Sequence, residues 1–277
     1  FRENPGGYHT ITISAFDTPN VMQGKEVIPG LITRENVEAT KNKYGEKSAF
    51  YRASVKAEFT MTEDCYFDTE RLSLLQESSK QGETFKPHVI GRRYGAAIDP
   101  AGQGVGEKAS AHSMSILDCQ TGEFVVDYTS MESPEDFAQR AYQIWRDFQR
   151  PLLQIEPNGV GLAMIVIFKG LAKVDGIELN LVYADKDRTK VGWPASDSQR
   201  DRMLVDLAMG IRQGALIPYS RAAIDELFSF EKKEKGSPAH ALGARDDRVM
   251  AMAWANWVSG QVPRQVTQTE ALSYARL

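Results

Sequence analysis

The order of strands and helices that the sequence predicts between residues 89 and 260 limits the fold more than any other feature. Three strands come before the first helix, and a short turn at Gln120-Thr-Gly joins the second and third, which predicts an antiparallel hairpin. After the hairpin, helices alternate with strands. The predicted strands are 94–99, 112–117, 123–128, 152–156, 178–184 and 215–217, and the predicted helices are 134–148, 159–173, 196–213, 222–230 and a last one from Asp246.

This order of elements favours an α/β fold of the ribonuclease H-like kind, in which a mixed sheet of three initial antiparallel strands and then parallel strands is flanked by helices. A Rossmann domain would alternate strand and helix from its first strand. The glycines that follow Asp99 also fail to form a dinucleotide-binding pattern, because Glu107 stands where the third glycine would fall. We therefore expect a ribonuclease H-like sheet and no dinucleotide cofactor.

The first 88 residues have a different pattern. Residues 9–16 alternate like a strand, 33–44 have the N-cap threonine and following glycine of a short helix, and 53–59 resemble a second strand. These elements are too few for an independent doubly wound domain. We interpret 1–88 as the trailing part of another domain that ends in a polar linker near 76–86, followed by a sheet domain over 89–260 and a polar tail over 261–277.

Composition removes several classes of protein. With 277 residues the chain can bury a sizeable core, and no apolar run reaches the roughly 18 to 20 residues of a membrane span. Cys65 and Cys119 lack metal-ligand spacing, so we expect reduced thiols in a cytoplasm and no zinc site. A net charge of −4 argues against a dedicated nucleic-acid binder, but it is compatible with a nuclease whose cleft alone is basic.

Carboxylates stand at three places where core elements end or begin. Asp99 closes the first strand, Glu156 closes 152–156, and Asp246-Asp247 open the last, apolar helix. Ionised groups at such places are costly to desolvate, and converging carboxylates repel one another unless a positive charge compensates them. A divalent cation is the simplest compensation, since Mg²⁺ and Mn²⁺ prefer hard oxygen ligands. The pattern predicts a two-metal phosphodiesterase site.

Each carboxylate also has a simpler explanation when it is taken alone. Asp99 begins a glycine-rich loop that could be a plain strand connection, and Glu156 and the aspartate pair could complement helix dipoles. Helical periodicity lets either Asp246 or Asp247 face the sheet end. An actin-like or sugar-kinase-like phosphate loop, which also places an aspartate with nearby glycine at a first strand end, is a further alternative.

Basic residues lie near the predicted acids in the sequence. Lys186, Arg188 and Lys190 follow the strand 178–184, which we expect to end at the same sheet edge as Glu156. Such residues can bind backbone phosphates, although runs of charge are more often simply solvated. Four arginines flank the acids in sequence, namely Arg92, Arg93, Arg245 and Arg248.

Several of these motifs occur together in one known family. Ala97-Ile-Asp99-Pro-Ala-Gly, Ile155-Glu156-Pro-Asn-Gly-Val-Gly, Arg188-Thr-Lys190 with Gly192, and Gly243-Ala-Arg-Asp246-Asp247-Arg-Val-Met-Ala resemble, in order, motifs of the nuclease domain of tailed-bacteriophage terminase large subunits. The resemblance spans about residues 88–260. Residues 8–20, with Gly30-Leu-Ile-Thr and Phe50-Tyr-Arg, resemble the end of that family's packaging ATPase domain and its linker.

The resemblance implies an endonuclease that cuts concatemeric double-stranded viral DNA during genome packaging, by hydrolysis with two Mg²⁺ or Mn²⁺ ions. Asp99, Glu156 and one of Asp246 and Asp247 would hold the metals; Asp247 is the first choice, because some members have histidine as the second residue of the pair. Lys186, Arg188, Lys190, Arg245 and Arg248 would contact DNA. The implied partners are double-stranded DNA, the small terminase subunit, the portal protein and a ring of large subunits, in the cytoplasm of the infected bacterial host.

The sequence departs from that family in one important respect. It contains no Gly-x-x-x-x-Gly-Lys-Ser/Thr phosphate loop, so we expect no ATPase activity from this chain alone. Two other functions stay open. One is a non-catalytic DNA-gripping or docking module of the packaging motor, and the other is an actin-like phosphotransferase, which would need a second, repeated subdomain that the sequence does not show.

Overall fold

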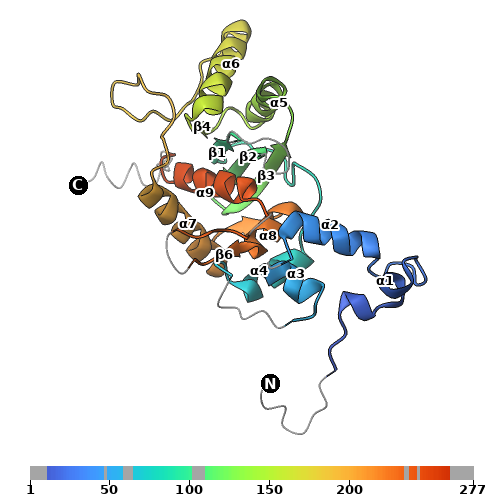
Figure 1. Ribbon diagram of the computed structural model, residues 1–277. Coiled ribbons are helices and arrows are strands. Elements are labelled where there is room, and N and C mark those ends of the chain that lie inside the picture. The colour runs from blue at the N-terminus through green and yellow to red at the C-terminus, as the bar shows by residue number, and fades with distance from the viewer. Residues whose placement is uncertain are drawn as a thin grey trace.

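The computed structural model describes residues 11–46, 49–58, 65–101, 110–233, 237–241 and 244–262. A mixed sheet lies at the centre of the molecule, with helices on both of its faces (Figure 1). Within these ranges, no helix is both long and apolar enough to cross a membrane.

The central sheet has the strand order β4-β1-β2-β3-β5 in the described part of the chain. The first three strands pair antiparallel with their sequence neighbours, whereas β4 lies parallel to β1 and β5 parallel to β3. This arrangement confirms the predicted ribonuclease H-like fold. The strands are β1 (Tyr94–Asp99), β2 (His112–Asp118), β3 (Glu123–Ser130), β4 (Leu152–Ile155) and β5 (Ile217–Pro218).

The strand predicted at 178–184 is reduced to isolated bridges. Leu181 pairs parallel with Leu153 of β4, but Tyr183 already pairs with Val191 and Gly192. The chain turns back here because Asp185 accepts hydrogen bonds from the backbone N–H groups of the loop that follows, at 2.7 to 3.1 Å. The prediction of a full strand was therefore wrong: a loop over 183–192 replaces its second half.

Helices cover the two sheet faces separately, and side-chain alternation along the strands divides the core into two clusters. Ala96 and Ile98 of β1 belong to the cluster under α5 and α6, while Ala97 belongs to the cluster under α4, α7, α8 and α9. The helices of the sheet domain are α5 (Pro134–Asp147), α6 (Gly159–Asp175), α7 (Asp197–Arg212), α8 (Arg221–Phe228) and α9 (Asp247–Ser259), and α4 (Thr69–Glu77) precedes the sheet.

The helix starts follow from side-chain caps that the sequence displays. Ser133 accepts a hydrogen bond from the Asp136 N–H, and Asn158 accepts one from the Gly161 N–H at 2.8 Å. Each of these bonds satisfies a backbone donor that has no partner within its helix. The cap at Asn158 matters for the site, because it starts α6 two residues after Glu156.

The described residues before position 59 form short helices: the 3₁₀ helix Ala15–Asp17, α1 (Pro19–Gln23), α2 (Arg34–Tyr44) and α3 (Ala49–Ser54). Helix α2 confirms the prediction for 33–44. Strands were predicted at 9–16 and 53–59. The structure describes residues 11–16 and 53–58 of these ranges and neither forms a strand, so the prediction is wrong there; residues 9, 10 and 59 lie outside the described residues. Val55 and Tyr51, one helical turn apart, instead pack with Val37 in a small separate core. A two-stranded pair, β6 (Phe230–Glu231) and β7 (Ala239–His240), was not predicted.

The predicted linker lies partly against the sheet. Residues 80–86, which we call the strap, run along the edge of β3: the Asp127 N–H donates to the Glu83 carbonyl and the Phe85 N–H donates to the Val125 carbonyl, both at 2.9 Å. Before the strap, Leu72 and Leu75 of α4 are buried in the same cluster as α7, α8 and α9. The segment from residue 65 therefore shares the core of the sheet domain.

Candidate active site

Asp99 and Glu156 lie side by side because their strands are parallel neighbours. Ile98 of β1 is paired with Ile155 of β4, and the Glu156 N–H donates to the Ile98 carbonyl at 3.3 Å, so the ladder continues to the next residue. The carboxyl ends of parallel strands meet at one edge of a sheet, which is where open α/β sheets bind ligands. The two predicted strand-end carboxylates are thus brought together.

Helix α9 brings the third carboxylate-bearing segment to this edge. A Cβ on Gly95 would lie 3.1 Å from the Ser259 nitrogen, which places the end of α9 over the start of β1. Asp99 shares this face with Gly95 by strand alternation, and α9 begins at Asp247. The Ala111 N–H, just before β2, donates to Asp247 Oδ2 at 3.1 Å. The start of α9 is therefore fixed at the edge that carries Asp99.

The electrostatics of Asp99 show how closely the acids gather. Burial raises the pKa of Asp99 well above its usual value, and the charges of Glu156, Asp246 and Asp247 raise it further. A side-chain hydrogen bond with Glu156 acts in the same direction. Within the described residues, no lysine, arginine or histidine forms an ion pair with Asp99 or Glu156. This pair of acids is not neutralised by the protein groups that the structure describes.

The two aspartates at the start of α9 have different surroundings. Asp247 is buried, at 5% exposure, and burial raises its pKa against the opposing effect of the Ala111 N–H. Asp246 is partly exposed and pairs with Arg200 of α7 at 2.8 Å through Oδ2, and its Oδ1 lies 4.0 Å from His240 Nε2. Within the described part of the chain, Asp247 therefore has no direct cationic contact, whereas Asp246 pairs with Arg200.

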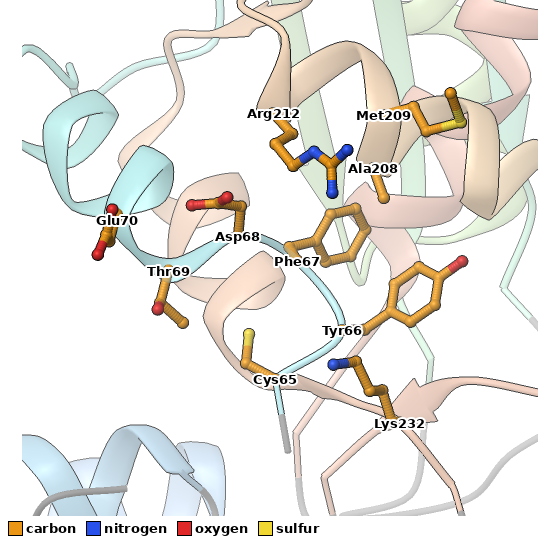
Figure 2. Close-up of a pocket in the computed structure, with 10 residues that line it drawn as sticks. All are labelled: Cys65, Tyr66, Phe67, Asp68, Thr69, Glu70, Ala208, Met209, Arg212 and Lys232. Carbon is orange, nitrogen blue, oxygen red and sulfur yellow. The ribbon is translucent and has the colours of Figure 1, made fainter. Parts of the chain in front are cut away.

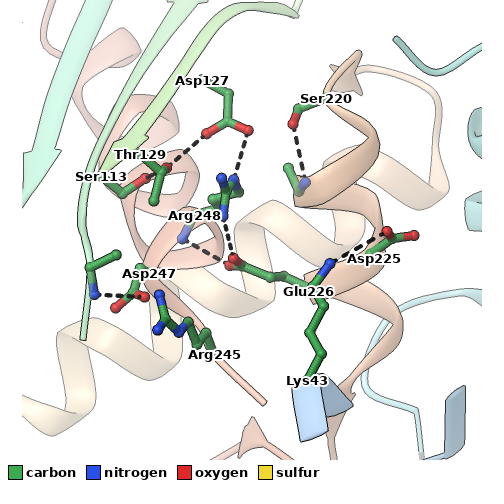
Figure 3. A network of polar contacts seen from close by, with 12 residues as sticks. Lys43, Ser113, Asp127, Thr129, Ser220, Asp225, Glu226, Arg245, Asp247 and Arg248 are labelled. Carbon is green, nitrogen blue, oxygen red and sulfur yellow. Dashed lines mark hydrogen bonds and ion pairs between the residues drawn. The ribbon is translucent and has the colours of Figure 1, made fainter. Parts of the chain in front are cut away.

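A buried ionic network holds the first turn of α9 (Figure 3). Arg248 Nε donates to Asp127 of β3 at 3.0 Å, and its Nη1 donates to Glu226 of α8 at 2.8 Å. The Asp127 carboxylate also accepts a hydrogen bond from Thr129, whose hydroxyl lies 2.8 Å from that of Ser113. Arg248 therefore ties β3 and α8 to the residue next to Asp247.

The donor chemistry of this site fits a divalent cation. The acids supply only carboxylate oxygens, which are the ligands that Mg²⁺ and Mn²⁺ prefer. Among the residues that the structure describes, however, no group of three or more His, Cys, Asp or Glu side chains is arranged to hold one metal ion. Arg200 contacts Oδ2 of Asp246, and the Ala111 N–H contacts Oδ2 of Asp247, so one oxygen of each carboxylate is already hydrogen-bonded.

The predicted DNA-contacting residues fall into three groups. Lys186, Arg188 and Lys190 are exposed on the loop 183–192, whose last residue, Gly192, packs so tightly against the strand end that a Cβ there would lie 2.2 Å from the Ile155 carbonyl oxygen. Arg245 lies beside Asp247 in Figure 3 and contacts the Met131 sulfur at 3.1 Å. The third group is Arg248, which the network encloses.

Two of the four arginines that flank the acids in sequence, Arg92 and Arg93, do not lie near them in space. Arg92 and Arg93 line a cleft with Tyr94 and Leu152, the first residues of β1 and β4. The six residues of β1, about 17 Å at roughly 3.3 Å per residue, separate this end of the sheet from Asp99. Closeness in sequence here becomes distance along a strand.

Sequence reasoning missed three residues around the site: Arg200, Asp127 and Glu226. Arg200 is 46 residues from its partner Asp246, and Asp127 is 121 residues from Arg248. No local pattern marks such pairs. The only available signal was Glu226 itself, an acid within the apolar helix pattern of α8, where an unpaired charge would be costly.

A second cleft, of about 470 Å³, lies elsewhere (Figure 2). Residues 65–70 form one wall, Ala208, Met209 and Arg212 of α7 form another, and none of the candidate acids lines it. Cys65 in this cleft and Cys119 are free thiols, and burial raises the pKa of each to about 11. Both thiols therefore stay protonated and weakly reactive at neutral pH.

Fold and site together define an α/β protein of the ribonuclease H-like class with an acidic site at the carboxyl edge of its sheet. No protein-family model matches the sequence, and no curated protein matches it at a significant level. The structure is similar to the large terminase nuclease from thermophilic phage G20c with bound cobalt, at 19% identity over 64% of this chain and 88% of that one, with a TM-score of 0.48.

Two further solved structures show a similar, remote likeness. The G20c nuclease with bound magnesium has 19% identity over 67% of this chain and 95% of its own, with a TM-score of 0.47. The human cytomegalovirus terminase nuclease domain, soaked in manganese and with inhibitor bound, has 9% identity over 74% and 97%, with a TM-score of 0.48.

Proposed function

We propose that this chain is a metal-dependent DNA endonuclease that hydrolyses phosphodiester bonds with two divalent cations, Mg²⁺ or Mn²⁺. The observation that supports it is the convergence of Asp99, Glu156 and the pair Asp246-Asp247 from three separate segments on one sheet edge, close enough to raise the pKa of Asp99. Carboxylates gathered in this way repel one another unless a cation joins them.

In this proposal Asp99, Glu156 and Asp247 hold the cations, with Asp246 as the alternative ligand from α9. The bound ions supply activation of water and neutralisation of the charge on the leaving oxygen. The protein fixes the ligands: β1 and β4 set the spacing of Asp99 and Glu156, and the Ala111 N–H orients Asp247. The acids come from β1, β4 and α9, elements whose positions are set by strand pairing and helix packing.

The proposed DNA contacts are basic groups on two segments that adjoin the acids. Lys186 and Lys190 lie on the loop whose stem adjoins the end of β4, and Arg245 lies beside Asp247. Arg188 belongs to the same loop. We assign Arg248 to orienting α9 rather than to DNA, because its guanidinium already donates to Asp127 and Glu226.

The biological setting of the proposal comes from the motif resemblance. It is the cutting of concatemeric double-stranded viral DNA during packaging, with the small terminase subunit, the portal and a ring of large subunits as partners, in the cytoplasm of the bacterial host. The predicted division would make residues 1–88 the trailing ATPase segment and linker, 89–260 the nuclease domain and 261–277 a tail. Because α4 and the strap pack on the sheet domain, we group residues 65–88 with that domain. The sequence carries no Walker-type phosphate loop, so ATP hydrolysis is not part of the proposal.

Nicking of supercoiled plasmid by the purified chain tests this function. We expect Mn²⁺- or Mg²⁺-dependent relaxation that a chelator stops and that Asp99→Asn abolishes. The matched control is Asp197→Asn, an exposed acid at the start of α7, which should cut like the wild type. Equal cutting by the Asp99 variant, or cutting in excess chelator, would exclude the proposed site.

One observation favours a second candidate, a DNA-gripping module without catalysis. Asp246 is already neutralised by Arg200 at 2.8 Å, and no three acids among the described residues are arranged around one ion. Titration calorimetry separates the two functions. A chain that takes up no Mn²⁺ but binds DNA in a salt-sensitive way would be the gripping module, whereas Mn²⁺ binding that Asp99→Asn removes supports the nuclease.

A further inference from the structure

A cleft of about 500 Å³ opens at the end of the sheet opposite the candidate active site. Its walls come from the starts of β1 and β4, the segment before β1, the loop 183–192 and the residues after α9. We call it the arginine cleft, after Arg92, Arg93 and Arg188, which line it. This volume lies within the usual range for sites that hold a small ligand.

The charge of the arginine cleft has one sign. Among the residues that the structure describes, its titratable lining residues are the three arginines, His88 and two tyrosines, Tyr94 and Tyr183, with no aspartate or glutamate. The chain as a whole has a net charge of −4, so this concentration of positive charge is local. A cavity with several guanidinium groups and no lining acid attracts anions.

Two of the guanidinium groups are held in place before any ligand arrives. Arg92 Nη1 donates at 2.8 Å to Asp118, whose side chain is 1% exposed and whose other oxygen accepts the Gln120 N–H at 2.9 Å. The Arg188 guanidinium lies over the Tyr183 ring, 4.7 Å from its centroid. An arginine has five N–H donors, so Arg92 keeps donors for a ligand. Groups fixed in this way lose little entropy on binding.

The inner wall of the cleft is rigid and largely closed. Tyr94 and Phe148 are buried edge to face, with ring centroids 5.4 Å apart, and His88 lies 5.4 Å from the Tyr94 ring. These rings are packed against one another rather than left free for a base to stack on. The exposed chemistry of the cleft is therefore that of the guanidinium groups, which bind phosphate through paired N–H donors.

The loop 183–192 connects this cleft with the candidate active site. Its last residue, Gly192, lies against the Ile155 carbonyl, next to Glu156, and is bridged to Tyr183, which lines the cleft together with Arg188. The far wall of the cleft, at Arg93 and Tyr94, lies at the start of β1, whose six residues place it about 17 Å from Asp99. At about 3.4 Å per nucleotide, this distance corresponds to roughly five nucleotides of a DNA strand.

We propose that the arginine cleft is a second nucleic-acid contact, which binds a backbone phosphate about five nucleotides from the carboxylates while the loop 183–192 carries the strand between the two sites. The proposal rests on the nuclease function proposed above. It differs from a contact made by the loop alone, because Arg93 lies in the cleft but not in the loop. It also predicts that the DNA extends past the active site on the β4 side.

Fluorescence anisotropy with a labelled 24-base-pair duplex in excess chelator tests the cleft without any cutting. We expect Arg188→Gln and Arg93→Gln each to weaken binding about fivefold to tenfold and to lower the slope of log Kd against log salt by about 1. The control Arg212→Gln removes the same charge from an exposed position in the other cleft and should bind within twofold of wild type. Wild-type binding by Arg93→Gln, even with weakened binding by Arg188→Gln, would leave a contact of the loop alone and would overturn the proposal.

Two further arms identify the ligand and separate this proposal from the nuclease. Inorganic phosphate at 10 mM should compete with DNA in the wild type but much less in Arg188→Gln. A different result would overturn the DNA contact: if phosphate stabilises the protein while the variants bind DNA like the wild type, the cleft is a site for free phosphate. Asp99→Asn should bind the duplex like wild type. If the wild type fails to cut but the cleft variants still lose DNA binding, the cleft proposal holds and the nuclease proposal fails.

Discussion

Arg248 and Glu226 share two hydrogen bonds. The Arg248 backbone N–H donates to Glu226 Oε2 at 2.9 Å, and its Nη1 donates to Oε1 at 2.8 Å, so one carboxylate of α8 holds both the backbone and the side chain of the residue that follows Asp247. On the preceding residue of α8, Asp225 lies 3.9 Å from Lys43 of α2 and accepts a hydrogen bond from Gln76 of α4. Helix α8 therefore links the helices before the sheet to the start of α9.

Removing the positive member of this network should be strongly destabilising. In Arg248→Met, the buried carboxylates of Asp127 and Glu226 lose their shared counter-charge, and we expect the free energy of unfolding to fall by about 3 to 5 kcal/mol. Urea denaturation measures the change, with Arg212→Met, an exposed arginine, expected within about 0.5 kcal/mol of wild type. A loss below about 1 kcal/mol would show that the network is not a structural support.

The same network predicts a pH dependence. Burial raises the pKa of Glu226 to about 7, in spite of the opposing effect of Arg248. Because the folded protein binds this proton more tightly than the unfolded chain, the contribution of Glu226 to stability is greatest below about pH 4.5 and is lost as the pH rises through 7. Glu226→Gln cannot titrate, so its stability relative to wild type should improve between pH 5 and pH 7.5. If urea denaturation shows the same change in unfolding free energy between pH 5 and pH 7.5 for both proteins, Glu226 is not the group that titrates.

Neutralising Asp99 should stabilise the metal-free protein. Burial and three neighbouring carboxylates raise the pKa of Asp99, so its ionised form is unfavourable at neutral pH. In chelator, Asp99→Asn should raise the melting temperature by a few degrees, or about 1 kcal/mol. With Mn²⁺ at a hundredfold excess over Kd, the wild type should gain about 2.7 kcal/mol and the variant should not. A variant less stable than wild type in chelator would mean that the acids are not in repulsive contact.

Gly192 should tolerate no side chain. Its φ is +78°, and a Cβ at this position would lie only 2.2 Å from the Ile155 carbonyl oxygen, so alanine requires a backbone shift. Gly192→Ala should cost about 1 to 3 kcal/mol and lower plasmid nicking by moving the strand end that carries Glu156. The control Gly170→Ala, in the middle of α6 with open space around it, should instead stabilise the protein by roughly 0.5 to 1 kcal/mol. If the two variants are equally stable, Gly192 does not pack tightly against the Ile155 carbonyl.

The sequence was sufficient to predict the sheet domain where local signals decide the structure. Caps such as Ser133 and Asn158 mark helix starts within three residues, and the turn at 120–122 fixes the hairpin that makes the sheet mixed. Alternation alone was a poorer guide before residue 59. There the predicted strands had no neighbouring strand to pair with, and short helices formed instead.

The sequence predicted which segments meet at the site, but it did not predict the contacts of each side chain. Strand ends that carry Asp99 and Glu156 must share an edge in a parallel pair, which follows from topology. The difference between Asp246 and Asp247 depends on Arg200, an ion-pair partner on another helix. Positions of Arg92 and Arg93 could be judged only once the direction of β1 was known.

The strap over residues 80–86 has a consequence for any fragment of this protein. It pairs with Val125 and Asp127 on the side of β3 that faces away from β2, and Lys86 reaches Glu123 on the same strand. A fragment that begins at the predicted boundary near residue 89 would leave these backbone groups without partners, as a template for strands of other molecules. The strap thus protects the sheet against edge-to-edge aggregation, and a soluble fragment of the sheet domain should begin before residue 65, so that it keeps both the strap and α4.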